Sequence, residues 1–301
     1  MRVAVTGATG RLGSALITAL EDAPFTGPAG PIAWARADFD LDHPEGIGRT
    51  IDRDRPEVVV HTAAWTDVDA CAREPELALR RNGDATGVLA AACADRGIDL
   101  VVVSTNEVFS GERSDGRGYG PDDETGPPNP YGASKLAGEQ AAIDAYGHAG
   151  RAGRLGIVRT AWLFGPPGSD FPRKIIDAAE RSITSKVPLR VVDDEWGNPT
   201  YAADAAEAIV ELLADDAHHG VHHLVGVPPA SRAAWARDIL ARTGIETRVE
   251  EVPASTWSRA STPPRWGVLE PTPMPSGVPM RPWPAAMADY APALQRERAR
   301  R

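Results

Sequence analysis

Short apolar runs alternate with amphipathic segments along the first half of the chain. Each run is bounded by Gly, Pro or polar residues, which is typical of a buried strand, and the segments between the runs have helical spacing. The predicted strands are residues 2–6, 32–35, 58–60, 100–103 and 155–160. The first predicted helix follows the first strand and ends at about residue 22, and the others span about 44–54, 74–81, 84–96 and 131–146. Strand–helix units of roughly 30 residues predict an α/β fold built on a doubly wound parallel sheet of the Rossmann type.

The second half has a less regular pattern. Helices are expected at residues 171–182, 201–214 and 232–242, strands are expected at 189–192, 221–225 and 247–252, and the chain beyond Pro253 is expected to be irregular with a mobile, charged tail. We therefore expect a dinucleotide-binding domain over residues 1–165 and a smaller C-terminal substrate-binding lobe over 166–301. Residues 188–225 are expected to return to the main sheet.

Charge and composition exclude several classes of function. The net charge of −10 argues against non-specific nucleic-acid binding and against attachment to anionic membranes. No apolar run approaches the roughly 20 residues that cross a bilayer. A strand begins almost at once, which leaves no signal peptide, and the two cysteines, Cys71 and Cys93, make no disulfide framework. We expect a cytoplasmic protein.

A glycine-rich loop follows the first strand. Gly7, Gly10 and Gly13 are spaced so that the chain can turn sharply, a pyrophosphate can approach the backbone, and the next helix can pack close to the sheet. This pattern favours nucleotide binding over a tight turn without a ligand. Arg36 follows the second strand, where a basic residue accepts the 2′-phosphate of NADP, so NADPH is slightly favoured over NADH unless Arg36 is only a solvated loop charge.

Polar and small residues end two further strands at the same edge of the sheet. Ala63 and Ala64 follow the third strand, and Ser104 and Thr105 follow the fourth. Ligands of doubly wound sheets bind at the carboxyl ends of the strands. The glycine loop and these two strand ends are therefore expected to line one site.

Tyr131 and Lys135 form a candidate acid–base pair. Asn129 is a good N-cap and Pro130 a good first helical residue, so a helix is expected to start just before Tyr131. Residues four apart lie on one helix face, and a nearby ammonium lowers the pKa of a phenol. An exposed helix face is the simpler explanation for an isolated pair, and only the convergence with the strand ends favours a site.

These motifs together resemble the extended short-chain dehydrogenase/reductases, and within them the dTDP-4-dehydrorhamnose reductase family. The likeness spans about residues 1–252 and rests on these segments: 7–13, 40–46, 61–69, Asn82, 159–164, 194–200 and 223–225. It implies a catalytic triad of Thr105, Tyr131 and Lys135. It also implies that NADPH or NADH is bound by Gly7, Thr9, Gly10, Arg11, Leu12, Gly13, Arg36, Asp40, Leu41, Ala63, Ala64, Ser104, Tyr131 and Lys135.

The resemblance further implies reduction of the 4-keto group of a dTDP-4-keto-6-deoxy sugar, for rhamnose supply or for a specialised glycoside. The implied partner is a nucleotide sugar, in a monomer or a homodimer. The substrate-binding residues expected are Thr66, Val68, Asn106, Glu107, Trp162, Glu195 and Arg265. The alternatives are an NAD-dependent sugar-nucleotide epimerase or dehydratase, and a non-catalytic regulatory relative that resembles the methionine adenosyltransferase beta subunit.

The sequence departs from the family pattern at two places. The family follows its Thr with Asp-Tyr, whereas Asn106 and Glu107 follow Thr105 here. Glu107 either binds a sugar hydroxyl or an amine, or it faces solvent. Near the C-terminus the family has Arg-Pro-x-Asn-Ser, which residues 263–267 only echo, so we expect Arg265 to take over diphosphate binding.

A histidine-rich segment resembles a metal cluster at first sight. It contains His218, His219, His222 and His223. Successive residues of a strand point to opposite faces, so these four side chains cannot all converge. We therefore expect a turn and a strand here, and no metal site.

Overall fold

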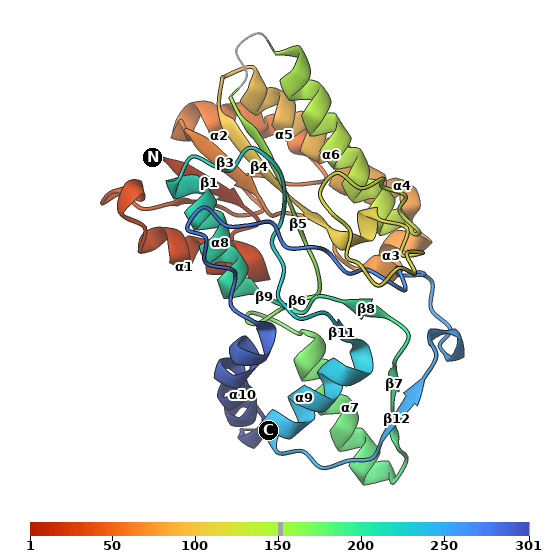
Figure 1. Cartoon of the computed structure of the whole chain (residues 1–301). Coiled ribbons are helices and arrows are strands. Elements are labelled where there is room, and N and C mark those ends of the chain that lie inside the picture. Colours follow the sequence, from red (N-terminus) through yellow and green to blue (C-terminus); the bar gives the residue numbers. More distant parts are fainter. Residues whose placement is uncertain (150–152, 301) are drawn as a thin grey trace.

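A parallel sheet forms the centre of the molecule. The computed structural model describes residues 1–149 and 153–300. The sheet has the strand order β10-β5-β4-β3-β1-β2 (Figure 1). Its strands are β1 (Val3–Thr6), β2 (Ile32–Trp34), β3 (Val58–His61), β4 (Asp99–Thr105), β5 (Leu155–Thr160) and β10 (Gly220–His223). The order reverses direction between β1 and β3, and ligand sites of such sheets lie at the carboxyl ends beside that reversal.

Helices cover both faces of the sheet, which confirms the predicted doubly wound fold (Figure 1). One face is covered by α1 (Arg11–Glu21) and α8 (Ala202–Ala214), and the other by α2 (Ile47–Asp54), α5 (Ala85–Ala94) and α6 (Pro130–His148). Strand residues alternate between the two cores: Val3 and Val5 pack with α1 and α8, whereas Ala4 packs with the other three helices. Burial on both faces explains why these strands are continuous apolar runs.

A smaller lobe lies below the sheet (Figure 1). Its helices are α7 (Phe171–Ser185), α9 (Arg232–Thr243) and α10 (Trp283–Ala299), and its paired strands are β6 (Leu163–Phe164) with β9 (Thr200–Tyr201), β8 (Trp196–Gly197) with β11 (Ala230–Ser231), and β7 (Leu189–Val192) with β12 (Val249–Val252). The return of residues 188–225 to the main sheet is therefore only partly right. β10 joins the main sheet, but β7 pairs with β12 inside the lobe. The boundary near residue 165 stays a prediction.

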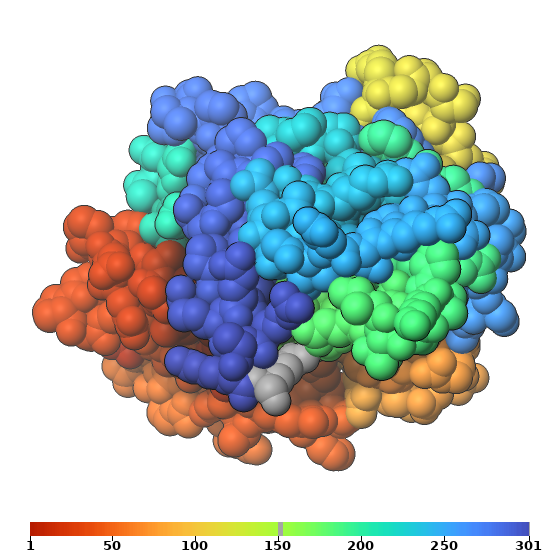
Figure 2. All heavy atoms as spheres, turned by 90° about the horizontal axis from the view of Figure 1, so that it is seen from below, coloured from red at the N-terminus to blue at the C-terminus, as the bar shows by residue number. Residues whose placement is uncertain are grey.

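The C-terminal helix α10 corrects the expectation of an irregular chain for residues 283–299, whereas residues 257–282 are irregular as predicted. It is helical from Trp283 to Ala299 and lies against α9 on the lower face, as Figure 2 shows in dark blue and cyan. Its buried face pairs Met287 and Tyr290 with the apolar core of the lobe. The Tyr290 hydroxyl also donates a hydrogen bond of 2.9 Å to the buried carboxylate of Asp170. Tertiary packing of one face stabilises this helix despite Pro292 in its interior.

The segment between β3 and β4 is helical but more broken than the sequence predicts. It comprises α3 (Val68–Arg73), α4 (Pro75–Ala78), a π-helical turn η3 (Leu79–Asp84) and then α5. Single 3-10 turns occur at η1 (Pro24–Thr26), η2 (Pro44–Gly46), η4 (Asn106–Val108) and η5 (Ala254–Thr256). The π-helical turn places Asn82 so that its amide bonds both the backbone of Trp65 and the hydroxyl of Ser134 on α6. None of the helices in the described residues is long and apolar enough to cross a membrane.

Candidate active site

The glycine loop after β1 has the close approaches that its spacing predicts. Gly7 has a φ of +64°, and a Cβ there would lie 2.8 Å from the backbone nitrogen of Ala63. A Cβ on Gly13 would collide with the carbonyl oxygen of Gly7. Gly10 is the N-cap of α1 and no side chain caps this end. The positive end of the α1 dipole is therefore open to an anion such as a pyrophosphate.

Eight of the predicted cofactor-binding residues line one cavity of about 300 Å³ at this edge of the sheet. Its full lining is Gly7, Thr9, Gly10, Arg36, Phe39, Asp40, Leu41, Thr62, Ala63, Ala64, Trp65 and Arg81. A groove between a glycine loop and two strand ends fits an extended dinucleotide. Small side chains on the β3 side allow a flat ring to lie against the backbone.

Two arginines lie at the mouth of this cavity. Arg36 is exposed and forms ion pairs with Asp40 at 3.4 Å and with Asp42 at 3.0 Å. Arg81 forms a bidentate pair with Asp42 and stacks over the Trp65 ring, 5.0 Å from its centroid. The sequence predicted Arg36 as a cofactor-binding residue but did not predict Arg81. Arg81 lies in the π-helical turn, and no sequence motif predicts that turn.

The side chains of Arg11 and Ser104 form hydrogen bonds within the protein, and their role in cofactor binding stays a prediction. The Arg11 guanidinium donates to the carbonyls of Gly165, Pro167 and Ser169 at 2.6 to 3.2 Å, so it fastens the turn after β6 to the start of α1. The Ser104 hydroxyl donates a short hydrogen bond to the buried carboxylate of Glu139. Arg11 thus joins α1 to the turn after β6, and Ser104 joins β4 to α6. Leu12 and Gly13 are buried in the first turn of α1.

Tyr131 lies beside Thr105 because the first turn of α6 packs on the end of β4. Thr105 ends β4, and its hydroxyl oxygen accepts the backbone N–H of Glu107 at 3.2 Å. The Asn129 side chain caps α6 by accepting the N–H of Gly132 at 2.9 Å, as predicted. A Cβ on Gly132 would collide with the carbonyl oxygen of Glu107, so the first turn of α6 packs directly on the turn after β4.

Burial sets the protonation states of the proposed triad. It raises the pKa of Tyr131, the charge of Glu107 raises that pKa further, and a hydrogen bond with Thr105 acts in the opposite direction. The pKa of Tyr131 is therefore raised in sum, and the expectation that Lys135 lowers it stays a prediction. Burial lowers the pKa of Lys135 itself to about 8, against the charge of Glu139. Tyr131 is protonated at neutral pH, the form that a proton donor needs.

A buried ion pair supports this wall of the site. Glu139, one turn after Lys135 on α6, accepts two hydrogen bonds from the guanidinium of Arg159 at 2.7 and 3.2 Å. Both side chains are almost fully buried. The pair links α6 to β5 and leaves Glu139 as the nearby anion that favours the charged form of Lys135.

The lower lobe faces the triad with two arginines that the sequence did not mark. Arg232 begins α9, and its guanidinium stacks over Trp162 at 3.5 Å from the ring centroid. The carboxylate of Glu195 pairs with Arg232 at 3.7 Å and, at short range, with Arg259. Glu195 is thus buried between two cations. Arg232 starts a helix and Arg259 lies in a loop, positions without a recognisable motif.

The other predicted substrate residues have different placements. Thr66 is exposed just before α3, and Val68 begins that helix. Asn106 donates from its side chain to the carbonyl of Gly267 at 2.9 Å and so ties the end of β4 to the C-terminal segment. Arg265 is exposed and pairs with Asp194 at 2.8 Å, and its assignment to the diphosphate stays a prediction.

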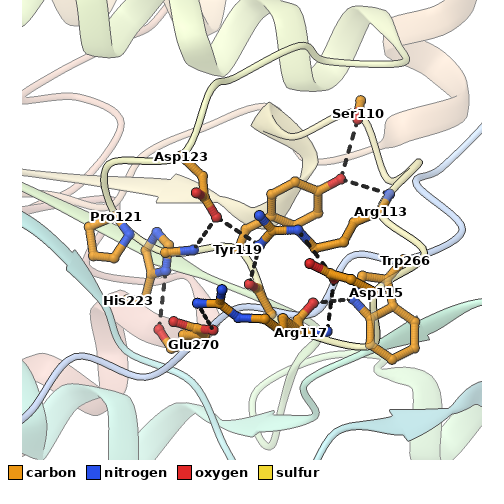
Figure 3. A network of polar contacts seen from close by, with 12 residues as sticks. Ser110, Arg113, Asp115, Arg117, Tyr119, Pro121, Asp123, His223, Trp266 and Glu270 are labelled. Carbon is orange, nitrogen blue, oxygen red and sulfur yellow. Dashed lines mark hydrogen bonds and ion pairs between the residues drawn. The ribbon is translucent and has the colours of Figure 1, made fainter.

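The long loop between β4 and α6 is fixed against the C-terminal segment, as Figure 3 shows. The Tyr119 backbone bonds Val268 and Glu270, and the Arg113 guanidinium packs over the Tyr119 ring at 4.8 Å while it pairs with Asp123 at 2.8 Å. From the C-terminal segment, the Trp266 indole donates to the carbonyl of Arg117 at 2.7 Å (Figure 3). These contacts fasten the loop between β4 and α6 to the C-terminal segment.

The histidine side chains do not converge, and each of the three that form hydrogen bonds has a different partner. His218 bonds Asp99, His222 bonds the carbonyl of His219, and His223 bonds the carbonyl of Glu270. Within residues 1–149 and 153–300 no group of three or more His, Cys, Asp or Glu side chains is arranged to hold a metal ion.

Comparison with known proteins identifies the family. A family model described as the RmlD substrate binding domain matches residues 1–296. The chain is 35% identical over 297 residues to the dTDP-4-dehydrorhamnose reductase of Streptomyces griseus, covering 96% of this chain and 93% of that protein. It is also 35% identical to a dTDP-4-keto-6-deoxy-D-glucose reductase of Streptomyces niveus, covering 96% of each.

Solved structures agree. The crystal structure of a dTDP-4-dehydrorhamnose reductase from Bacillus anthracis in complex with NADP superposes with a TM-score of 0.84 at 27% identity and covers 96% of this chain and 98% of that one. An ortholog from Clostridium acetobutylicum gives a TM-score of 0.86 at 28% identity, with 98% and 100% covered. The chain therefore belongs to the RmlD substrate binding domain family, and it is an NDP-sugar 4-ketoreductase of the dTDP-4-keto-6-deoxy sugar reductase type.

Proposed function

We propose that the protein reduces the 4-keto group of a dTDP-4-keto-6-deoxy sugar, dTDP-4-dehydrorhamnose or a close relative, with Thr105, Tyr131 and Lys135 as its catalytic residues. The observation that carries the proposal is the packing of the first turn of α6 on the turn after β4, which sets Tyr131 beside Thr105. The relatives' names support the substrate class.

NADPH is the proposed cofactor, with NADH as the second choice. The open N-terminus of α1 suits its pyrophosphate, and Arg36 and Arg81 supply positive charge where an adenosine ribose 2′-phosphate lies in such folds. Gly7 and Gly13 leave no room for a side chain, which agrees with the glycine spacing of a dinucleotide-binding loop. When bound, NADPH supplies the hydride for the keto carbon.

The roles of the three side chains follow from the charge that develops on the keto oxygen. Tyr131 donates its proton to that oxygen, and Thr105 hydrogen-bonds the same oxygen as its negative charge grows. Lys135, protonated below about pH 8, holds the hydroxyls of the nicotinamide ribose and stabilises the tyrosinate that remains. Arg232 and Arg259 offer cations to the nucleotide end of the substrate.

The proposal is tested by NADPH oxidation with a panel of dTDP-4-keto-6-deoxy sugars, wild type beside Tyr131→Phe. The variant keeps the ring and loses the acid, so its turnover falls by at least about 100-fold, the scale of a lost general acid. Thermal unfolding of both proteins controls for folding. Equal turnover in the two proteins would contradict the assignment of Tyr131, and no oxidation by wild type with any member would contradict the function.

A further inference from the structure

Glu107 is a carboxyl group beside the triad whose hydrogen bonding is only half complete. Its Oε2 accepts a hydrogen bond of 2.6 Å from the amide of Asn129, the residue that caps α6. In the described part of the chain no other side chain bonds or pairs with this carboxyl group. One oxygen is therefore fixed, and the other has no side-chain partner in this part of the chain.

The groups around Glu107 come from both halves of the molecule. Tyr131 and Cys71 face it from α6 and α3, and Arg232 and Arg259 face it from the lower lobe. The two guanidiniums are already paired with Glu195, so neither forms an ion pair with Glu107. Burial raises the pKa of Glu107, while Asn129 and the two arginines act in the other direction. A carboxyl group in this environment is a better base than an exposed one.

The position of Glu107 matters because of the chemistry of a ketone. Hydrogens on the carbons next to a keto group are acidic, since the electron pair left behind is delocalised onto the keto oxygen. Thr105 and Tyr131 are the groups proposed to hold that oxygen, and Glu107 follows Thr105 by two residues. The charge of Glu107 acts on Tyr131, so its carboxyl group lies near the group that is proposed to hold the keto oxygen.

We propose that Glu107 is a second acid–base residue, which exchanges a hydrogen on a carbon next to the keto group with solvent, an activity separate from reduction. The inference rests on the proposed function. The C–H bond breaks and its proton goes to Glu107; its electron pair forms the C=C bond, and the carbonyl π pair moves to the oxygen, where Tyr131 stabilises it. Reversal with a solvent-derived proton restores the ketone, so nothing is oxidised or reduced.

The test uses dTDP-4-keto-6-deoxyglucose in D₂O with the protein and NADP⁺, so that no hydride is available. Proton NMR follows loss of the signal at C3 or C5 against a protein-free sample. Wild type should exchange one position about 100-fold faster than the background. Glu107→Gln keeps an oxygen for Asn129 and should lose this acceleration, whereas Glu107→Asp should retain part of it. Glu112→Gln, an exposed glutamate of the neighbouring loop, should behave as wild type.

Reduction of the same sugar by NADPH is measured on the same preparations, and thermal unfolding confirms that each variant is folded. Wild type that reduces the sugar without accelerated exchange overturns the inference and leaves the function intact. Exchange by Glu107→Gln at the wild-type rate overturns it as well. Wild type that neither reduces nor exchanges the sugar overturns the function, and the inference falls with it.

Discussion

Lys135 is the residue whose burial has the clearest consequence for activity. Its side chain is 3% exposed, and burial lowers its pKa to about 8. Below that pH it is an ammonium that can bind ribose hydroxyls, and above it the group becomes a neutral amine. Tyr131, whose pKa is raised, stays protonated over the same range.

We therefore expect kcat/KM for the cofactor to fall tenfold per pH unit above about pH 8, because the free enzyme loses the Lys135 proton there. Initial rates between pH 6 and 10 at low cofactor concentration measure this. Lys135→Arg, whose guanidinium stays charged, should be slower at neutral pH and lack the break. The same break in both proteins would rule out Lys135 as its source.

His61 is a buried histidine whose protonation makes the free energy of unfolding depend on pH. It is fully buried at the end of β3 between the hydroxyls of Thr6 and Thr86, and burial lowers its pKa to about 3, with a smaller effect of Lys135. The unfolded chain takes up a proton at this histidine below about pH 6.5, and the folded protein does not. The free energy of unfolding must therefore fall as the pH falls from 6.5 towards 3.

His61→Asn should remove that share of the acid sensitivity. Between pH 6.5 and 5 the wild type should lose about 2 kcal/mol more than the variant, at about 1.4 kcal/mol per pH unit. Urea unfolding of both proteins at the two pH values gives the comparison. Parallel losses in the two proteins would show that His61 is not the titrating group.

At the level of elements, α10 shows how a helix can be hidden by its composition. Trp283, Met287, Tyr290 and Leu294 recur at helical spacing and are all buried. The prolines of this segment nevertheless led to the prediction of irregular chain. Pro284 lies in the first turn, where a missing N–H costs little, and Pro292 is tolerated because the face opposite to it packs on the lobe.

Met287→Ala should test the contribution of this face. Met287 is completely buried in the core of the lobe, so the truncation should cost about 2–5 kcal/mol of the free energy of unfolding. Arg296→Ala, an exposed change on the same helix, should cost within about 0.5 kcal/mol. Chemical denaturation measures both. Similar small effects would mean that α10 contributes little to the stability of the lobe.

For the whole molecule, the apolar runs predicted the parallel sheet because its strands are buried on both faces, and the glycine spacing predicted the loop that approaches β3. The contacts of the C-terminal half with the sheet domain could not be predicted in the same way. They are single long-range hydrogen bonds, such as Asn106 with Gly267 and Asp69 with Ser261. No local pattern encodes such contacts, which is why the ion pair of Arg259 with Glu195 was not predicted.

The central claim, hydride transfer to the keto carbon of the sugar, is tested most directly by an isotope label. NADPH carrying two deuterium atoms at C4 of the nicotinamide is incubated with the protein and a dTDP-4-keto-6-deoxy sugar in ordinary water. The account predicts a product with one deuterium on C4 of the sugar, seen by NMR and mass spectrometry. A reduced sugar without deuterium at C4, or retention of both deuterium atoms in the nicotinamide, would contradict it.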